Sequence, residues 1–291
     1  MDFAFFGQQL INGLVNGMAY VLISTGLTLV FGVLRVINFA HGEFYMLGAF
    51  LTYYAAKVLG LPYLPGVLVA TIAVAGLGLV ANAFFFWPLR KEHEFTILLS
   101  SLGLALLITH LAEHTFGHDP KYVASPFADE VLEVGALILT WQRILIFLVA
   151  MAVLGLTYAM IRYTLFGKMM RATAQSPDGA ALTGINIRFV HALTFVLACG
   201  LAALAGALVG PTAMIFPTVG SWAVLKGFIV VVMGGLGSVP GALVGGLSLG
   251  VIEAMAGAYV SLGFMEAIGY AIIILVLLWR PEGLFGAAAR R

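Results

Sequence analysis

The sequence predicts an all-α fold, a polytopic bundle of transmembrane helices. Hydrophobic residues make up 62% of the 291-residue chain and charged residues only 9%, whereas soluble domains carry about 25% charged residues. A crossing helix needs about 20 residues, so the length leaves room for about eight to ten crossings and for no sizeable soluble domain. We therefore expect residues 1–291 to form a single transmembrane domain, and helices to carry its whole function.

Nine apolar segments are the candidate crossings. They cover residues 7–33, 36–56, 63–87, 95–113, 141–161, 189–210, 221–236, 241–260 and 263–279. The first is too long for a signal-peptide core and has no Lys or Arg before residue 35, so we expect it to be retained as a helix. Two places are candidates for broken or re-entrant helices: the polar start of the second segment, and the Gly-rich run 234–241 between the seventh and the eighth.

The distribution of Lys and Arg predicts the orientation. With an outside N-terminus and nine crossings, three cations fall outside and ten on the cytoplasmic side, with Lys226 left inside a helix. The outside cations are Lys57, Lys121 and Arg143; the cytoplasmic ones are Arg35, Arg90, Lys91, Arg162, Lys168, Arg171, Arg188, Arg280, Arg290 and Arg291. Cytoplasmic loops are enriched in cations, so an outside N-terminus and a cytoplasmic C-terminus are expected.

The longest charged stretch, residues 162–188, is expected to be a cytoplasmic loop that contains a short helix. Ser176 is a suitable N-cap, Pro177 suits the first helical position and Asp178 favours the positive end of the helix dipole. Gly184 is a natural stop, so the sequence predicts a helix from Pro177 to Thr183. Ala180, Ala181, Leu182 and Ile185 give it a small apolar face. Such a face suits docking into a groove of a soluble partner; the alternative is a solvated connector.

Glycine is enriched, with 35 residues in the chain, or about 12% against an average of about 7%. Many glycines lie four residues apart: Gly13/Gly17, Gly206/Gly210, Gly237/Gly241/Gly245 and Gly246/Gly250. Small residues at this spacing let membrane helices approach closely. Around residues 234–246 Gly, Ser and Pro coincide, which indicates either a break that lines a substrate path or a purely structural turn.

Several polar residues fall inside apolar segments, where charge is costly. Lys226 can pair with Glu253 or Glu266. Asn38, His41 and Glu43 are candidates for a gate or path lining, with a satisfied polar cluster at a helix break as the alternative. Asn12 and Asn16 share a helix face and either line the path or bond neighbouring helices.

His110, His114 and His118 recur every fourth residue, but Gly117 and Pro120 interrupt the helix. Three or four convergent ligands are required for a metal site, so we expect none here. A contact surface for a binding protein is the interpretation we favour.

The chain resembles a known family, the permease subunits of ATP-binding-cassette importers for branched-chain amino acids, in their smaller H type. The resemblance rests on blocks in family order along nearly the whole chain: residues 16–20, 26–32 and 36–44, Gly167 with Arg171-Ala172, Asp178 with Ala181 and Gly184-Ile185, then 234–242 and 280–286. It implies a second, M-type permease subunit, two cytoplasmic ATP-binding subunits, a periplasmic substrate-binding protein and a place in the bacterial cytoplasmic (inner) membrane. No cofactor and no nucleic acid are implied.

By this resemblance, residues 167–185 are the element that couples the permease to the ATPases. The expected coupling residues are Gly167, Lys168, Arg171, Ala172, Asp178, Ala181, Leu182, Gly184 and Ile185. The expected path or gate residues are Asn12, Asn16, Asn38, His41, Glu43, Gly235, Gly237, Ser238, Lys226 and Glu253.

The chain contains no G-x-x-x-x-G-K-[ST] phosphate loop, so ATP hydrolysis must come from partner subunits. It contains no motif for catalysis, so we expect a transporter subunit and not an enzyme. An ion-coupled secondary carrier that uses Glu43, His41 or Glu253 is the alternative of another class. Within the importer class, urea, short amides or aromatic acids are alternative substrates.

Overall fold

The computed structural model describes residues 3–280 and 282–285 and confirms the all-α polytopic bundle. The long helices are α1 (Phe3–Leu34), α2 (His41–Leu59), α3 (Tyr63–Ala81), α4 (Glu94–Phe116), α5 (Trp141–Tyr163), α8 (Ile187–Val209), α9 (Val219–Gly234), α10 (Val239–Tyr259) and α11 (Met265–Trp279). Shorter elements are the π-helix η1 (Asn82–Phe86), α6 (Leu165–Gln175), α7 (Pro177–Leu182), the 3-10 helix η2 (Leu262–Phe264) and strands β1 (Val131–Val134) and β2 (Leu137–Thr140).

Each predicted crossing corresponds to one long helix, but the span count of nine is not confirmed. Among the described residues, seven helices are long and apolar enough to cross a membrane. The other two are α2, which begins with His41 and Glu43, and α9, which is apolar but only 16 residues long. At about 1.5 Å per residue, α9 extends ~24 Å, less than the ~30 Å hydrocarbon core of a bilayer.

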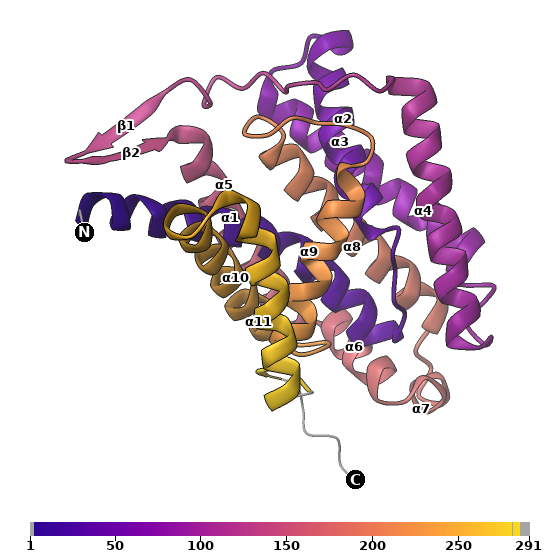
Figure 1. Ribbon diagram of the computed structural model, residues 1–291. Coiled ribbons are helices and arrows are strands. Elements are labelled where there is room, and N and C mark those ends of the chain that lie inside the picture. Colours follow the sequence, from indigo (N-terminus) through magenta and orange to yellow (C-terminus); the bar gives the residue numbers. More distant parts are fainter. Residues whose placement is uncertain (1–2, 281, 286–291) are drawn as a thin grey trace.

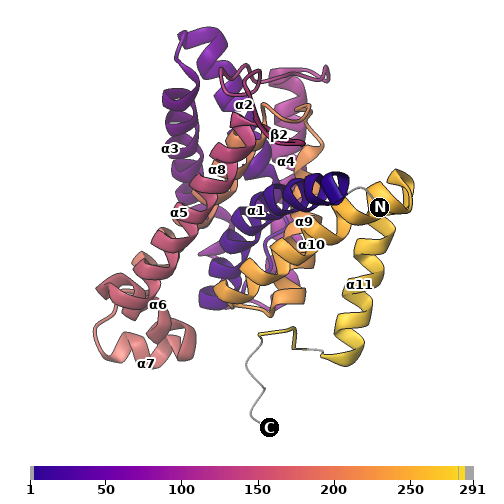
Figure 2. The same cartoon turned by 90° about the vertical axis from the view of Figure 1, so that its left-hand side faces the viewer.

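Helices α1 and α10 run side by side through the bundle (Figures 1 and 2), and glycine makes their close approach possible. A Cβ atom on Gly17 would lie 2.8 Å from the Gly246 carbonyl oxygen. A Cβ atom on Gly250 would lie 2.4 Å from the Gly13 carbonyl oxygen. The two pairs of glycines four residues apart therefore face each other, as expected for helices that associate without a hydrophobic drive.

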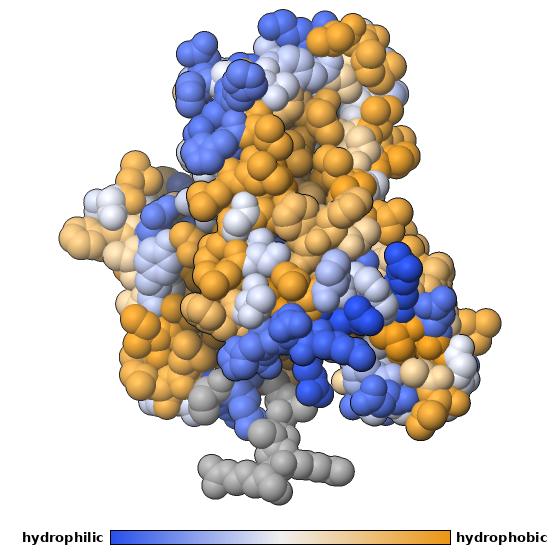
Figure 3. All heavy atoms as spheres, turned by 90° about the vertical axis from the view of Figure 1, so that its right-hand side faces the viewer, coloured by the Kyte–Doolittle hydropathy of each residue, from blue (hydrophilic) through white to orange (hydrophobic). Residues whose placement is uncertain are grey.

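The two ends of the bundle differ. One end, the α7 end, carries α6, α7 and the turn between η1 and α4; the other, the hairpin end, carries the β1–β2 hairpin and the α2–α3 turn (Figure 1). The antiparallel hairpin pairs Val131 with Thr140, and the all-α prediction did not include it. The face that bears α4 is apolar across its middle and hydrophilic toward both ends (Figure 3), as expected for a surface in contact with lipid.

The predicted break before the second crossing is present. The segment between α1 and α2 has no regular structure, and the His41 ring nitrogen Nε2 lies 3.1 Å from the Ile23 carbonyl oxygen. Ile23 lies ~16 Å along the helix axis before the end of α1, at about 1.5 Å per residue. The chain therefore runs back along α1 before α2 begins, and α2 begins beside the Ile23 turn of α1.

At the other predicted position the structure has a tight turn between two helices. Gly235 and Gly237 have positive φ angles of 101° and 82°. The Ser238 hydroxyl accepts a hydrogen bond from the Gly241 N–H at 3.1 Å and caps α10. The Gly-rich run thus closes the α9–α10 hairpin at the α7 end.

Candidate functional site

The α5–α6 junction is a compact corner at the α7 end, and two predicted coupling residues form it. Gly167 is buried, and a Cβ atom there would lie 2.1 Å from the Ile161 carbonyl oxygen, so no larger residue fits. The Arg171 guanidinium donates a hydrogen bond to the same carbonyl. The Thr164 hydroxyl accepts from the Gly167 N–H at 3.0 Å and caps α6. These contacts fix the direction in which α6 leaves α5.

Helix α7 follows the predicted pattern closely. The Ser176 hydroxyl accepts a hydrogen bond from the Gly179 N–H at 3.0 Å, Pro177 occupies the first turn, and Gly184 has a positive φ of 83°. The helix ends at Leu182, one residue before the predicted end. Helix α6 was not predicted as a helix, because its polar residues made the segment look like a loop. In the structure it buries Gly167, Met170 and Thr173 on one face.

The predicted coupling residues divide into two groups. Exposed residues that a partner can reach are Lys168, Arg171, Asp178, Ala181, Leu182 and Gly184. Gly167 is buried, and Ala172 and Ile185 are half-buried. The apolar face predicted for the short helix is divided, because Ala180 packs inward while Leu182 is 91% exposed. Leu182 is thus an apolar side chain held out from the bundle.

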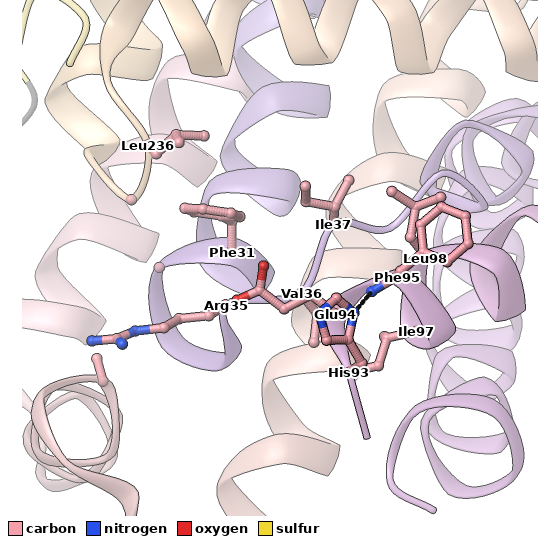
Figure 4. A pocket seen from close by; sticks show the side chains of 13 residues that line it. Phe31, Arg35, Val36, Ile37, His93, Glu94, Phe95, Ile97, Leu98 and Leu236 are labelled. Atoms are coloured by element: carbon pink, nitrogen blue, oxygen red, sulfur yellow. Dashed lines mark hydrogen bonds between the residues drawn. The ribbon is translucent and has the colours of Figure 1, made fainter. Parts of the chain in front are cut away.

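Two cavities open beside this unit at the α7 end. The larger, about 680 Å³, lies between the α1–α2 break, the start of α4, Ala174 of α6 and the α9–α10 turn. In Figure 4 the side chains of Phe31, Ile37 and Leu236 surround this space, while Arg35 extends away from His93 and Glu94. The smaller, about 410 Å³, is lined by Met170 and Arg171 of α6 and by Gly237 and Ser238. Movement of α6 therefore changes the walls of both.

Asn38, His41 and Glu43 lie together at the α1–α2 break, and all three are buried. The Asn38 side-chain oxygen accepts a hydrogen bond from the Ala40 N–H at 3.0 Å, which satisfies backbone exposed by the break. Asn38 Nδ2, His41 Nδ1 and Glu43 Oε2 have no hydrogen-bond partner among the described residues. None of the three lines a described cavity, so their path-lining role stays a prediction.

Lys226 and Glu253 form a buried ion pair between α9 and α10. The Lys226 Nζ lies 2.5 Å from Glu253 Oε1, and Lys226 is fully buried. Glu253 Oε2 accepts a hydrogen bond from the Tyr20 hydroxyl at 2.8 Å. Trp222 and Tyr270 place their rings 5.6 and 5.7 Å from the ammonium. Of the two predicted partners, Glu253 takes the pair, and Glu266 instead accepts from the Trp222 indole N–H at 3.1 Å.

Asn12 and Asn16 have different surroundings in the structure. Asn12 accepts a hydrogen bond from the Arg143 guanidinium and so ties α1 to α5. Asn16 lines a cavity of about 320 Å³ near the hairpin end, together with Tyr20, Arg143 and Trp222. Sequence reasoning counted Arg143 only as an outside cation. Its position just inside the apolar segment 141–161 was the signal for a role in the bundle.

A bundle of membrane-capable helices, with polar residues buried between them and cavities toward both ends, is the architecture of a polytopic membrane protein. Residues 9–278 match the family described as branched-chain amino acid transport system / permease component. The chain is 35% identical to the high-affinity branched-chain amino acid transport system permease protein LivH of Escherichia coli K12, over 98% of this chain and 97% of that protein. It is also 35% identical to BraD of Pseudomonas aeruginosa, which has the same description, over 96% and 95% of the two chains.

The chain therefore belongs to the branched-chain amino acid transport permease family, as the sequence resemblance indicated. It is a multi-pass membrane protein and a transport permease subunit, not an enzyme. Among solved structures, PsaBC from Streptococcus pneumoniae in complex with Fab is similar in fold, with a TM-score of 0.51 and 13% identity over 98% of this chain and 95% of that one.

Proposed function

We propose that the chain is the H-type permease subunit of an ATP-binding-cassette importer that moves branched-chain amino acids into the bacterial cytoplasm. Its partners in this proposal are an M-type permease subunit, two cytoplasmic ATP-binding subunits and a periplasmic substrate-binding protein. The relatives LivH and BraD are named as permease proteins of branched-chain amino acid transport systems, which supports the substrate class.

The α6–α7 unit is the observation that carries the proposal. A helix as short as α7 is marginal in water by itself. Here its first turn is capped, and the corner at Gly167 and Arg171 joins the unit to α5. An exposed Leu182 on such a peg suits insertion into a groove of a soluble partner.

The charge distribution supports a cytoplasmic α7 end. Of the cations predicted to be cytoplasmic, Arg162, Lys168, Arg171 and Arg188 lie on or beside the α6–α7 unit, and Arg280 follows α11. Arg290 and Arg291 lie outside the described residues. A cation-rich cytoplasmic side is the rule for membrane proteins, so the α6–α7 unit is on the side where ATP is available.

The mechanism follows from the walls of the cavities. When the ATPases close on ATP, they displace the docked α7 as a rigid body, and α6 moves with it. Met170, Arg171 and Ala174 of α6 line the cavities at the α7 end, so this displacement changes access to them. Alternating access then needs no ion gradient.

Purification from the native host tests the proposal. Two ATPase subunits are expected to co-purify with the chain, and uptake of leucine, isoleucine or valine into vesicles is expected to require ATP. The buried, incompletely paired Glu43 is what favours the rival, an ion-coupled carrier. Uptake driven by a proton gradient without ATP would establish that rival and exclude the importer.

The substrate is tested separately with the cognate binding protein. Branched-chain amino acids are expected to raise its melting temperature in a thermal-shift screen. Stabilisation by urea, short amides or aromatic acids instead would change the substrate and leave the importer class in place.

A further inference from the structure

The cavity near the hairpin end plays no part in the proposed mechanism. It holds about 320 Å³ and is bounded by six elements: α1, α2, α5, the end of α8 with the loop that follows, α9 and α11. Its lining residues are Val15, Asn16, Ala19, Tyr20, Ile23, Tyr45, Arg143, Ile146, Val209, Thr212, Ala213, Trp222 and Met265. At ~30 Å³ per water molecule, this space corresponds to about ten waters, enough for a small solute.

Arg143 is the only charged side chain among the described residues that line this cavity. One of its N–H groups is used by Asn12, and a guanidinium has several more to donate. Behind the wall, Lys226 and Glu253 neutralise each other. Arg143 is thus the one cation that faces the cavity among the described lining residues, while the Glu266 carboxylate is bonded to the indole of the wall residue Trp222 at 3.1 Å.

The remaining lining has both polar and apolar parts. Asn16 and Tyr45 line the cavity, and their side chains take part in no hydrogen bond with the described residues. Ile23, Ile146 and Val209 give it apolar walls. A guanidinium matches a carboxylate in two parallel hydrogen bonds, whereas one cation among apolar walls does not balance the higher charge of a phosphate. The chemistry fits a carboxylate that carries an apolar side chain.

We propose that this cavity is a binding site within the permease for the transported solute, in which Arg143 holds the carboxylate and Asn16 and Tyr45 supply further hydrogen bonds. The site lies at the hairpin end, the side opposite α7. This inference rests on the proposed function, and it adds recognition by the permease to recognition by the binding protein.

The test uses the purified permease complex with its ATPases and without the binding protein. Binding of radiolabelled leucine is measured in competition with 4-methylpentanoate, which keeps the carboxylate and loses the ammonium, and with leucinamide, which lacks the carboxylate. Leucine and 4-methylpentanoate are expected to compete, and leucinamide is not. Arg143→Gln is expected to weaken binding roughly 10- to 100-fold, the usual effect of losing a hydrogen bond to a charged group.

One further variant separates recognition from structure. Arg162→Gln, at the other end of α5, is the matched control and is expected to bind like the parent. Competition by leucinamide equal to that by leucine, or unchanged binding in a folded Arg143→Gln complex, would overturn the proposal. Both readouts are independent of ATP-driven uptake, so failure of the site and failure of the importer function are distinguishable.

Discussion

Removal of one partner of the Lys226–Glu253 pair should destabilise the bundle more than removal of both. In Lys226→Met the Glu253 carboxylate keeps only the Tyr20 hydroxyl at 2.8 Å as a described partner. Breaking a buried pair in this way costs about 3–5 kcal/mol, because one charge stays uncompensated away from water. The double variant Lys226→Met/Glu253→Gln has no charge to bury, so its loss of stability should be no more than ~1–2 kcal/mol.

The assay is unfolding in mixed micelles, followed by tryptophan fluorescence during titration with a denaturing detergent. A double-mutant cycle over the parent, the two single variants and the double variant gives the coupling energy, which from these costs should be at least ~4 kcal/mol. Lys168→Met, an exposed cation, is the control and should change stability by less than ~0.5 kcal/mol. Additivity of the two single effects within ~0.5 kcal/mol would refute the argument, because independent sites behave in that way.

Three further predictions test other parts of the structure. Asp178→Lys or Gly184→Pro should leave insertion intact while ATP hydrolysis continues without uptake in proteoliposomes; full uptake in both variants would contradict the docking role of α7. Gly17→Ala should lower stability by about 1–3 kcal/mol by overpacking against α10, because its Cβ would lie 2.8 Å from the Gly246 carbonyl oxygen. The control Gly76→Ala has no neighbour within 4 Å of its Cβ and should not lower stability. Equal melting temperatures of the two variants would contradict this reasoning. Gly283→Ala should speed hydrogen exchange at the Leu284 and Phe285 amides, which donate to the Met233 and Gly234 carbonyls, because its Cβ would lie 2.6 Å from Gly235. The control is Gly60→Ala: Gly60 also has a positive φ, but a Cβ atom there would have no neighbour within 4 Å. Exchange at the Leu284 and Phe285 amides should therefore stay slow in this control variant.

The sequence predicted the parts of the fold that depend on composition and local chemistry. Long apolar segments located the long helices, and Ser176, Pro177 and Gly184 located α7 because caps act within a few residues. Helix α6 was missed because its apolar residues follow a helical period over only a few turns, between charged residues. The hairpin was missed because each strand has only four residues, although Gly135, with a positive φ in its two-residue turn, was a local signal for it.

The candidate site was predictable only in part, because its geometry depends on tertiary contacts. Lys226 had two possible partners in the sequence, and only the packing of α9 on α10 selects Glu253. Asn12 and Asn16 share a helix face, but the position of Arg143 on α5 gives them different neighbours. Tyr20 and Trp222 looked like ordinary apolar-segment aromatics, and nothing local marked them as the wall between the ion pair and the cavity.

The pairing of α1 with α10 also constrains how the protein is made. The Tyr20–Glu253 hydrogen bond joins residues 233 positions apart, so α1 leaves the ribosome long before its partner is synthesised. Until α10 emerges, Lys226 would face the membrane without a counter-charge, which favours insertion of α9 and α10 as one hairpin through their tight turn. Chains interrupted before Glu253 therefore expose both the glycine face of α1 and an unpaired lysine.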